Sequence, residues 1–157
     1  MGIIHARVDE RLIHGQVATV WTNSLGAQRI YVANDQAIKD EIQIGALKMA
    51  KPVGVKLTIA SNRRAVKGLN SGKYDSEKVF LMTKSIKDMA YLIDNGLELT
   101  TFNVGNISAV EGSKAIKRSV ALTQEDIAIL QRLNDQGVNI TAQMVPAEPA
   151  TSILSFL

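Results

Sequence analysis

The chain has 157 residues, of which 46% are hydrophobic and 21% are charged, the balance of one globular domain with a real core. It contains no cysteine, which excludes disulfide frameworks, thiolate metal sites and cysteine nucleophiles. The net charge is only +3, the lysines and arginines are scattered, and aromatic residues make up 4%, so we expect no binding to nucleic acid.

The first dozen residues carry four charged side chains and therefore lack the apolar region of a secretory signal. No apolar run reaches the roughly 18–20 residues needed to cross a bilayer. We expect a cytoplasmic protein.

Short apolar runs rich in β-branched residues alternate with stretches of helical periodicity, a pattern typical of βα units and a parallel sheet. The first part of the chain predicts strand 3–8, helix 14–25, strand 29–33, helix 38–50, strand 55–60 and helix 61–69. The second part predicts strand 78–82, helix 85–95, strand 99–104, a loop over 105–112, strand 119–122, helix 124–134, strand 138–145 and a short closing helix after Pro146. Thr123 and Asp126 have the spacing of a capping box.

This alternation continues without a linker or a break in composition. It predicts one doubly wound α/β domain over residues 1–157, with a mostly parallel sheet and helices on both faces. Ligands of such sheets bind beyond the carboxyl ends of the strands. The loops to consider are residues 8–13, 34–37, 83–85 and 105–108.

Common nucleotide and metal motifs are missing from the sequence. Residues 68–73, GLNSGK, are one residue short of a phosphate-binding P-loop, and no G-x-G-x-x-G follows a strand. Two histidines do not make a histidine-rich metal site. We therefore expect neither a metal ion nor an organic cofactor.

The segment RVDERLIHGQV, residues 7–17, gathers charged residues and a histidine at the first junction of strand and helix. A neutral imidazole nitrogen has the lone pair needed to attack phosphorus, so His14 is a candidate nucleophile. Arg7 and Arg11 could donate to the oxygens of a phosphoryl group in transit, and Asp9 could hold an arginine or the imidazole. The alternative is a solvated charged turn with His14 as a structural residue, which composition by itself favours because charged turns are common.

The same segment resembles the active-site signature of subunit IIB of the mannose/fructose/sorbose family of the bacterial sugar phosphotransferase system. Further similarity covers nearly the whole chain, in residues 29–35, 79–83, 102–106 and 122–133. The residues that match the family motif are Arg7, Asp9, Arg11, His14, Gly15 and Gln16.

The resemblance implies that His14 accepts a phosphoryl group from a phosphohistidine of subunit IIA. It then passes the group to a sugar that arrives through the membrane permease subunits IIC and IID. The resemblance also implies a doubly wound α/β fold, no cofactor, and a cytoplasmic location at the inner face of the membrane through the permease. Asn106 stands where many family members have a second glycine after Gly105, which leaves open whether that loop binds the anion.

Four further residues each admit two interpretations. Asp35, at the end of the second strand, is either a helix cap or a residue that orients Arg7 or Arg11, and Thr83 has the same ambiguity. Trp21 is expected in the core, and His5 is expected to be structural rather than a second phosphoryl acceptor.

Two other functions remain open at this point. One is a module that only binds an anion through Arg7 and Arg11, and the other is a regulatory protein that is phosphorylated but does not deliver to a sugar. The sequence does not name the sugar, which could be mannose, fructose, sorbose, N-acetylgalactosamine or a related amino sugar. It also leaves open the phosphorylated ring nitrogen and the oligomeric state, a homo-oligomer included.

Overall fold

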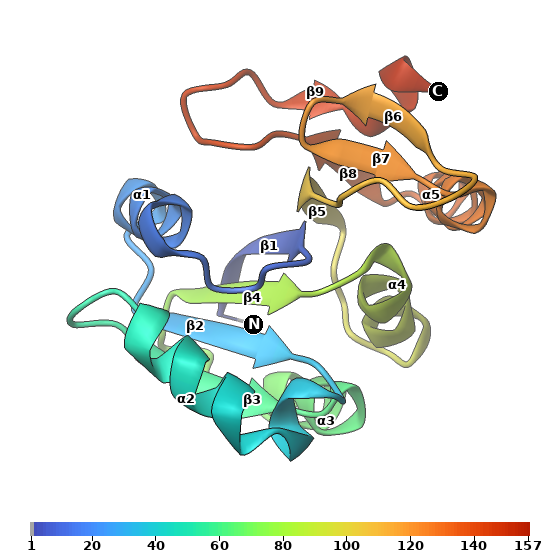
Figure 1. Cartoon of the computed structure of the whole chain (residues 1–157). Helices are drawn as coiled ribbons and strands as arrows, with labels where there is room; N and C mark the ends of the chain where they lie inside the picture. The colour runs from blue at the N-terminus through green and yellow to red at the C-terminus, as the bar shows by residue number, and fades with distance from the viewer. Residues whose placement is uncertain (1) are drawn as a thin grey trace.

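The computed structural model describes residues 2–157. One sheet has the strand order β3-β2-β4-β1-β5-β8-β9, in which only the edge strand β9 is antiparallel (Figure 1). The strands of this sheet are β1 (Ile3–Asp9), β2 (Arg29–Ala33), β3 (Lys56–Ala60), β4 (Val79–Thr83), β5 (Thr101–Asn106), β8 (Asn139–Ala142) and β9 (Thr151–Ser152). The prediction of a mostly parallel sheet is confirmed.

Helices cover both faces of the sheet, as predicted (Figure 1). They are α1 (Gly15–Leu25), α2 (Glu41–Ala50), α3 (Asn62–Asn70), α4 (Ile86–Asp94) and α5 (Gln124–Asp135). Side chains of β2 alternate between the faces: Ile30 and Val32 pack with α1 and α2, whereas Tyr31 and Ala33 pack on the side of α3, α4 and α5. Two hydrophobic clusters, one on each face, bury the sheet between them.

Local capping sets several helix boundaries. The predicted helix 38–50 is divided in the structure into a 3₁₀ turn, η1 (Ala37–Lys39), and α2, because Asp40 is extended and its carboxylate accepts from the backbone N–H groups of Ile42 and Gln43. The predicted capping box of Thr123 and Asp126 is present at the start of α5.

The C-terminal third differs most from the sequence prediction. The predicted strand 119–122 is present as β7 (Val120–Leu122), but it pairs in a hairpin with β6 (Lys114–Lys117), which was not predicted. The last predicted strand shortens to β8 before the chain returns as β9. Strands of two to four residues are too short for a period of two to be recognised. A short 3₁₀ helix, η2 (Ile153–Phe156), closes the chain, as predicted.

The parallel register places the ends of β1, β2, β4 and β5 at one edge, here called the carboxyl edge. The loop that carries His14 leaves the sheet there, between β1 and α1. Among the described residues, no helix has both the length and the apolar character to cross a bilayer.

A buried arginine ties this edge together. Arg7 on β1 is 0% exposed, and its guanidinium donates to the carbonyl of Gln143, which follows β8, at 3.0 Å. Its Cζ lies 5.2 Å from the ring centroid of Trp21 on α1. The guanidinium also lies against Gly105 on β5, where an added Cβ would come within 2.0 Å of Cζ. Gly105 therefore leaves the space that Arg7 occupies.

His5 lies on the α1 face of the sheet with its ring stacked on Trp21, the centroids 4.7 Å apart. The edge of the Phe80 ring is the other neighbour, and the buried Nε2 of His5 has no hydrogen-bond partner in residues 2–157. Burial, with a smaller contribution from the charge of Arg7, lowers the pKa of His5 to about 4. This environment agrees with a structural role for His5, and Trp21 lies in the core as predicted.

The close approach of Arg7 to Gly105 predicts a destabilised Gly105→Ala variant. The added methyl group must displace a guanidinium that is bonded on several sides, at a cost of about 1–3 kcal/mol in the free energy of unfolding. Urea denaturation followed by the fluorescence of Trp21, the single tryptophan, measures both the stability and the displacement of Arg7. Gly45→Ala is the matched control, because a Cβ at this helical position meets nothing within 4 Å. Equal midpoints and emission for Gly105→Ala and wild type would contradict the contact.

The environment of His5 predicts a pH-dependent stability. The unfolded histidine protonates near its ordinary pKa of 6.5, whereas the folded one protonates only near 4, so acid favours the unfolded state between these values. His5→Phe keeps the ring stack without the titrating group. We expect the loss of unfolding free energy between pH 7 and pH 4.5 to be smaller in this variant than in wild type, by up to about 2 kcal/mol, as measured by urea denaturation at both pH values. An identical pH dependence in the two proteins would show that His5 titrates normally in the folded state.

Candidate active site

The loop between β1 and α1 is anchored by two apolar side chains and exposes the histidine that follows them. Leu12 and Ile13 are buried in the hydrophobic cluster under α1. Leu12 has φ 57°, a left-handed conformation that costs an ordinary residue free energy, and burial of its side chain together with the bond from its N–H to the carbonyl of Asp9 at 2.9 Å offsets this cost. His14 follows Ile13 in the chain and is exposed.

The carboxylate of Asp9 is the centre of the loop. It is buried and accepts from Arg7 Nη2 at 3.2 Å and from three donors of Arg11, namely the backbone N–H, Nε and Nη2, at 3.0 to 3.1 Å. One buried negative charge therefore lies between two positive ones. Of the two roles predicted for Asp9, the structure shows the hold on the arginines, and it shows no bond from Asp9 to His14.

The two arginines differ in access to solvent. Arg7 is fully buried and its terminal nitrogens donate to Gln143 and Asp9, so it does not reach the surface that His14 occupies. Burial lowers the pKa of Arg7, and the carboxylate of Asp9 opposes that effect. The side chain of Arg11 is 26% exposed, and its Nη1 makes no hydrogen bond in the described part of the chain. Of the two arginines predicted to contact a phosphoryl group, only Arg11 has a donor at the surface.

His14 is the N-cap of α1, with extended backbone angles of −127° and 99° and no capping bond from its side chain. The imidazole is thus not used to complete the helix. Gly15 and Gln16, the first two helical residues, are both exposed, and their N–H groups make no hydrogen bonds in the described chain. Unpaired amides at a helix start carry partial positive charge that attracts an anion.

The other predicted site residues lie on the same edge but do not contact the arginines. Asp35 accepts from the backbone N–H of Asn62, the first residue of α3, at 2.8 Å, whereas the N-cap of that helix is Ser61. The structure shows no hydrogen bond between Asp35 and Arg7 or Arg11. Thr83 is buried and donates to the carbonyl of Ser85 at 3.0 Å. The backbone carbonyl of Asn106 accepts from Glu10 N–H at 3.0 Å, while its side chain makes no hydrogen bond to any described residue.

A polar cleft of about 410 Å³ opens between these loops. Glu10, Asn34, Asp35 and Lys84 are among its lining residues. Glu10 also accepts a hydrogen bond from the hydroxyl of Ser108. The cleft borders the loop of His14 on the side of α3 and α4.

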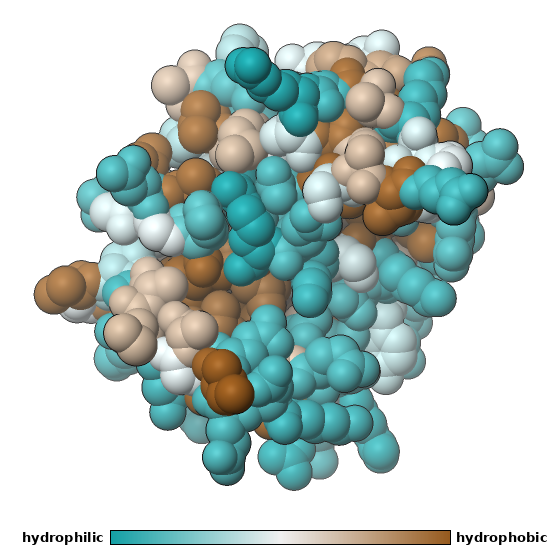
Figure 2. Space-filling view, viewed as in Figure 1, coloured by the Kyte–Doolittle hydropathy of each residue, from teal (hydrophilic) through white to brown (hydrophobic). Residues whose placement is uncertain are grey.

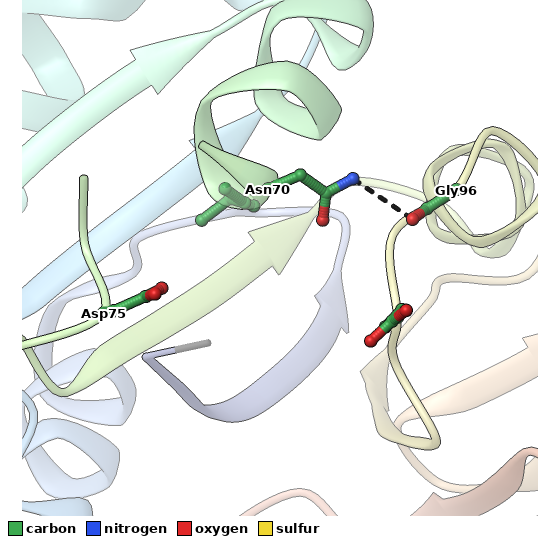
Figure 3. Close-up of a pocket in the computed structure, with 5 residues that line it drawn as sticks. Asn70, Asp75 and Gly96 are labelled. Carbon is green, nitrogen blue, oxygen red and sulfur yellow. Dashed lines mark hydrogen bonds between the residues drawn. The ribbon is translucent and has the colours of Figure 1, made fainter. Parts of the chain in front are cut away.

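A second polar pocket, of about 360 Å³, lies at the opposite edge of the sheet, where the strands begin. Asn70 points toward Gly96 and donates to its carbonyl at 3.1 Å, and Asp75 lies across the pocket (Figure 3). Asp75 precedes β4 and Gly96 precedes β5, so the sheet separates this pocket from His14. In residues 2–157, no group of three or more histidines and carboxylates is arranged to hold a metal ion.

Sequence reasoning missed the segment that follows β8. The carbonyl of Gln143 accepts from Arg7 and from Asn103, and the next carbonyl, that of Met144, accepts from Trp21 Nε1 at 2.9 Å. The identity of a residue does not indicate which group its backbone carbonyl bonds to. The sequence indicated this segment only through its position, because residues after β8 lie at the same carboxyl edge as the loops 8–13, 34–37, 83–85 and 105–108.

The family model described as PTS system sorbose subfamily IIB component matches residues 3–157. The sorbose-specific EIIB component of Lacticaseibacillus casei is 36% identical over 99% of this chain and 94% of its own length. The mannose-specific EIIAB component of Escherichia coli K12 is 30% identical, over 97% of this chain and 47% of that protein.

Solved structures agree with the sequence comparisons. The crystal structure of the IIBSor domain of the sorbose permease from Klebsiella pneumoniae has a TM-score of 0.94 and 34% identity, and the match covers 99% of this chain and 96% of the other. A IIB component of the N-acetylgalactosamine system of Escherichia coli has a TM-score of 0.91 and 28% identity. The chain therefore belongs to the sorbose subfamily of the IIB components of the phosphotransferase system.

Proposed function

We propose that this IIB component carries a phosphoryl group on His14, taken from a phosphohistidine of a IIA subunit and delivered to a sugar at the cytoplasmic side of the IIC and IID permease subunits. The observation that carries this proposal is the contrast within one loop. His14 is exposed and free of capping bonds, whereas the residues before it are held in place, Leu12 and Ile13 by burial and Arg11 by the carboxylate of Asp9.

The first transfer needs an imidazole lone pair directed at phosphorus. A neutral ring nitrogen of His14 attacks the phosphoryl group, a new P–N bond forms, and the P–N bond to the donor breaks, leaving the electron pair on the donor imidazole. In the second transfer a sugar hydroxyl oxygen attacks, its proton is released, and the bond to His14 breaks. Both steps move one phosphoryl group between nucleophiles and need no outside oxidant, reductant or nucleotide.

Arg11 and the start of α1 supply the positive charge for the oxygens of the moving group. The unpaired Nη1 of Arg11 donates to a phosphoryl oxygen, while Asp9 holds the rest of the guanidinium in place. The free N–H groups of Gly15 and Gln16 at the start of α1 are further donors for these oxygens. Because these donors are fixed before the phosphoryl group arrives, no reorganisation is needed at the moment of transfer.

Arg7, Asp35 and Thr83 act indirectly in this proposal. Arg7 fixes Asp9 and through it Arg11, so Arg7 is a positioning residue. Asp35 and Thr83 shape the neighbouring loops through their backbone contacts.

His14→Ala is expected to abolish phosphorylation. Wild-type protein incubated with phosphoenolpyruvate, the general phosphotransferase proteins and a matching IIA subunit should gain a single phosphoryl adduct by intact mass, labile in acid and stable in base. His5→Phe should keep the adduct, because the ring of His5 is stacked on Trp21 and its Nε2 is buried. A folded wild type that gains no adduct from a competent donor would favour a module that only binds anions. An adduct that is never delivered to a sugar with the permease present would favour a regulatory protein.

The two arginines should give different phenotypes. Arg11→Ala removes a transition-state donor from a partly exposed position, so the single-turnover rate of phosphorylation should fall about 10²-fold or more with little change in stability. Arg7→Ala leaves the carboxylate of Asp9 buried with one partner fewer, so the unfolding free energy should fall by about 3–5 kcal/mol. Rapid-quench kinetics and urea denaturation of both variants separate the effects. An Arg7→Ala variant with wild-type stability would contradict the structural ion pair, and one with a wild-type rate would contradict the role of Arg7 in positioning Arg11.

A further inference from the structure

An apolar groove of about 770 Å³ lies beside the proposed phosphorylation site, between α1 and the segment that joins α2 to β3. Gly15 and Gln16 form part of its wall at the start of α1. The groove is therefore continuous with the residue that follows His14. A macromolecule seated in it would be beside the imidazole.

Three large apolar side chains around the groove are exposed to solvent. Val53 is 100% exposed, Met49 is 90% exposed and Val20 is 48% exposed. Figure 2 shows hydrophobic residues gathered on this side of the molecule, in the region of α1 and α2. Single exposed apolar residues are common on protein surfaces, whereas several around one groove mark a surface that binds a partner.

The charge of the groove indicates which partner fits. Lys51 is the charged residue in its lining, and no carboxylate lines it. A phosphohistidine donor presents a phosphoryl group with about two negative charges, which a lysine beside the site attracts. The cytoplasmic loops of membrane proteins are instead rich in lysine and arginine, and these would be repelled by the same lysine.

We propose that this groove is the docking surface for the phosphorylated IIA donor, an inference that rests on the proposed function. Met49 and Val53 are the apolar anchors, and Lys51 steers the anionic donor toward His14. Binding of the donor along α1 brings its phosphohistidine to the exposed end of that helix, where the imidazole of His14 lies.

The experiment compares Met49→Glu and Val53→Glu with Ile42→Glu. Ile42 is a matched control, because it is 85% exposed on the same helix as Met49 and does not line the groove. The initial rate of His14 phosphorylation is measured at a donor concentration well below saturation. We expect a fall of about tenfold or more in Met49→Glu and Val53→Glu and no change in Ile42→Glu, since a charge on an anchor repels the donor and forfeits the apolar contact.

Two further measurements locate the defect at docking. Phosphoramidate, a small phosphoryl donor with no protein surface, should phosphorylate all four proteins at the same rate. Once they are phosphorylated, the variants should transfer the phosphoryl group to sugar at wild-type rates when they are mixed with vesicles that contain the permease. Circular dichroism and urea denaturation verify that each variant is folded.

Several outcomes would overturn the inference. Equal rates for Met49→Glu, Val53→Glu and wild type with the IIA donor would show that the donor docks elsewhere. A defect confined to delivery would assign the groove to the permease, and self-association of wild type that Met49→Glu abolishes would assign it to a second copy of this chain. A wild type that no IIA donor phosphorylates would instead refute the proposed function itself, which keeps the two failures distinct.

Discussion

A single buried carboxylate, that of Asp9, lies between two arginines, and the loop that carries His14 depends on it. Burial of a carboxylate costs free energy of folding unless its oxygens accept hydrogen bonds from paired charges. Here the carboxylate of Asp9 accepts from four donors. Three of these belong to Arg11, whose backbone and side chain are both held by the same carboxylate. The position of the partly exposed Arg11, three residues before His14 in the chain, is thereby fixed from inside the protein.

Arg7 connects Asp9 to parts of the protein outside the loop. Its guanidinium reaches the carbonyl of Gln143 after β8, lies over the ring of Trp21 on α1, and occupies the space that Gly105 leaves open on β5. Strand β1, helix α1, strand β5 and the segment after β8 thus meet at one buried positive charge, which is itself bonded to Asp9.

Within four residues the loop changes from buried to exposed. Leu12 and Ile13 hold the loop in the core, while His14 and Gly15 lie in solvent at the start of α1. In the proposed function, His14 receives a phosphoryl group from one partner and gives it up at another, which requires that both can reach the imidazole. The apolar groove along α1 and the acidic cleft bordered by Glu10 lie on different sides of this exposed residue. Two partners could therefore approach His14 over surfaces of different chemistry.

The sequence by itself determined the alternation of strands and helices, the two-sided burial of the sheet, and the position of the His14 loop at the carboxyl edge. These follow from local periodicity, from capping residues such as Thr123, and from the rule that ligands bind at the carboxyl edge. The resemblance of residues 7–17 to a family signature added the chemistry. Strand β6, which pairs with the predicted strand β7, and the short edge strand β9 were missed because they are held by pairing partners and not by their own pattern.

Only the tertiary structure decided what each charged residue of the site does. Arg7 and Arg11 are equivalent in sequence, but β1 lies in the middle of the sheet between β4 and β5, so the arginine on the strand is buried and the one in the loop reaches solvent. Asp35 lies one loop away from the arginines and instead accepts from the first N–H of α3, because β2 pairs with β3 and brings the start of that helix to it. Burial and hydrogen-bond partners of this kind arise from contacts between distant segments, and the identity of a residue does not contain them.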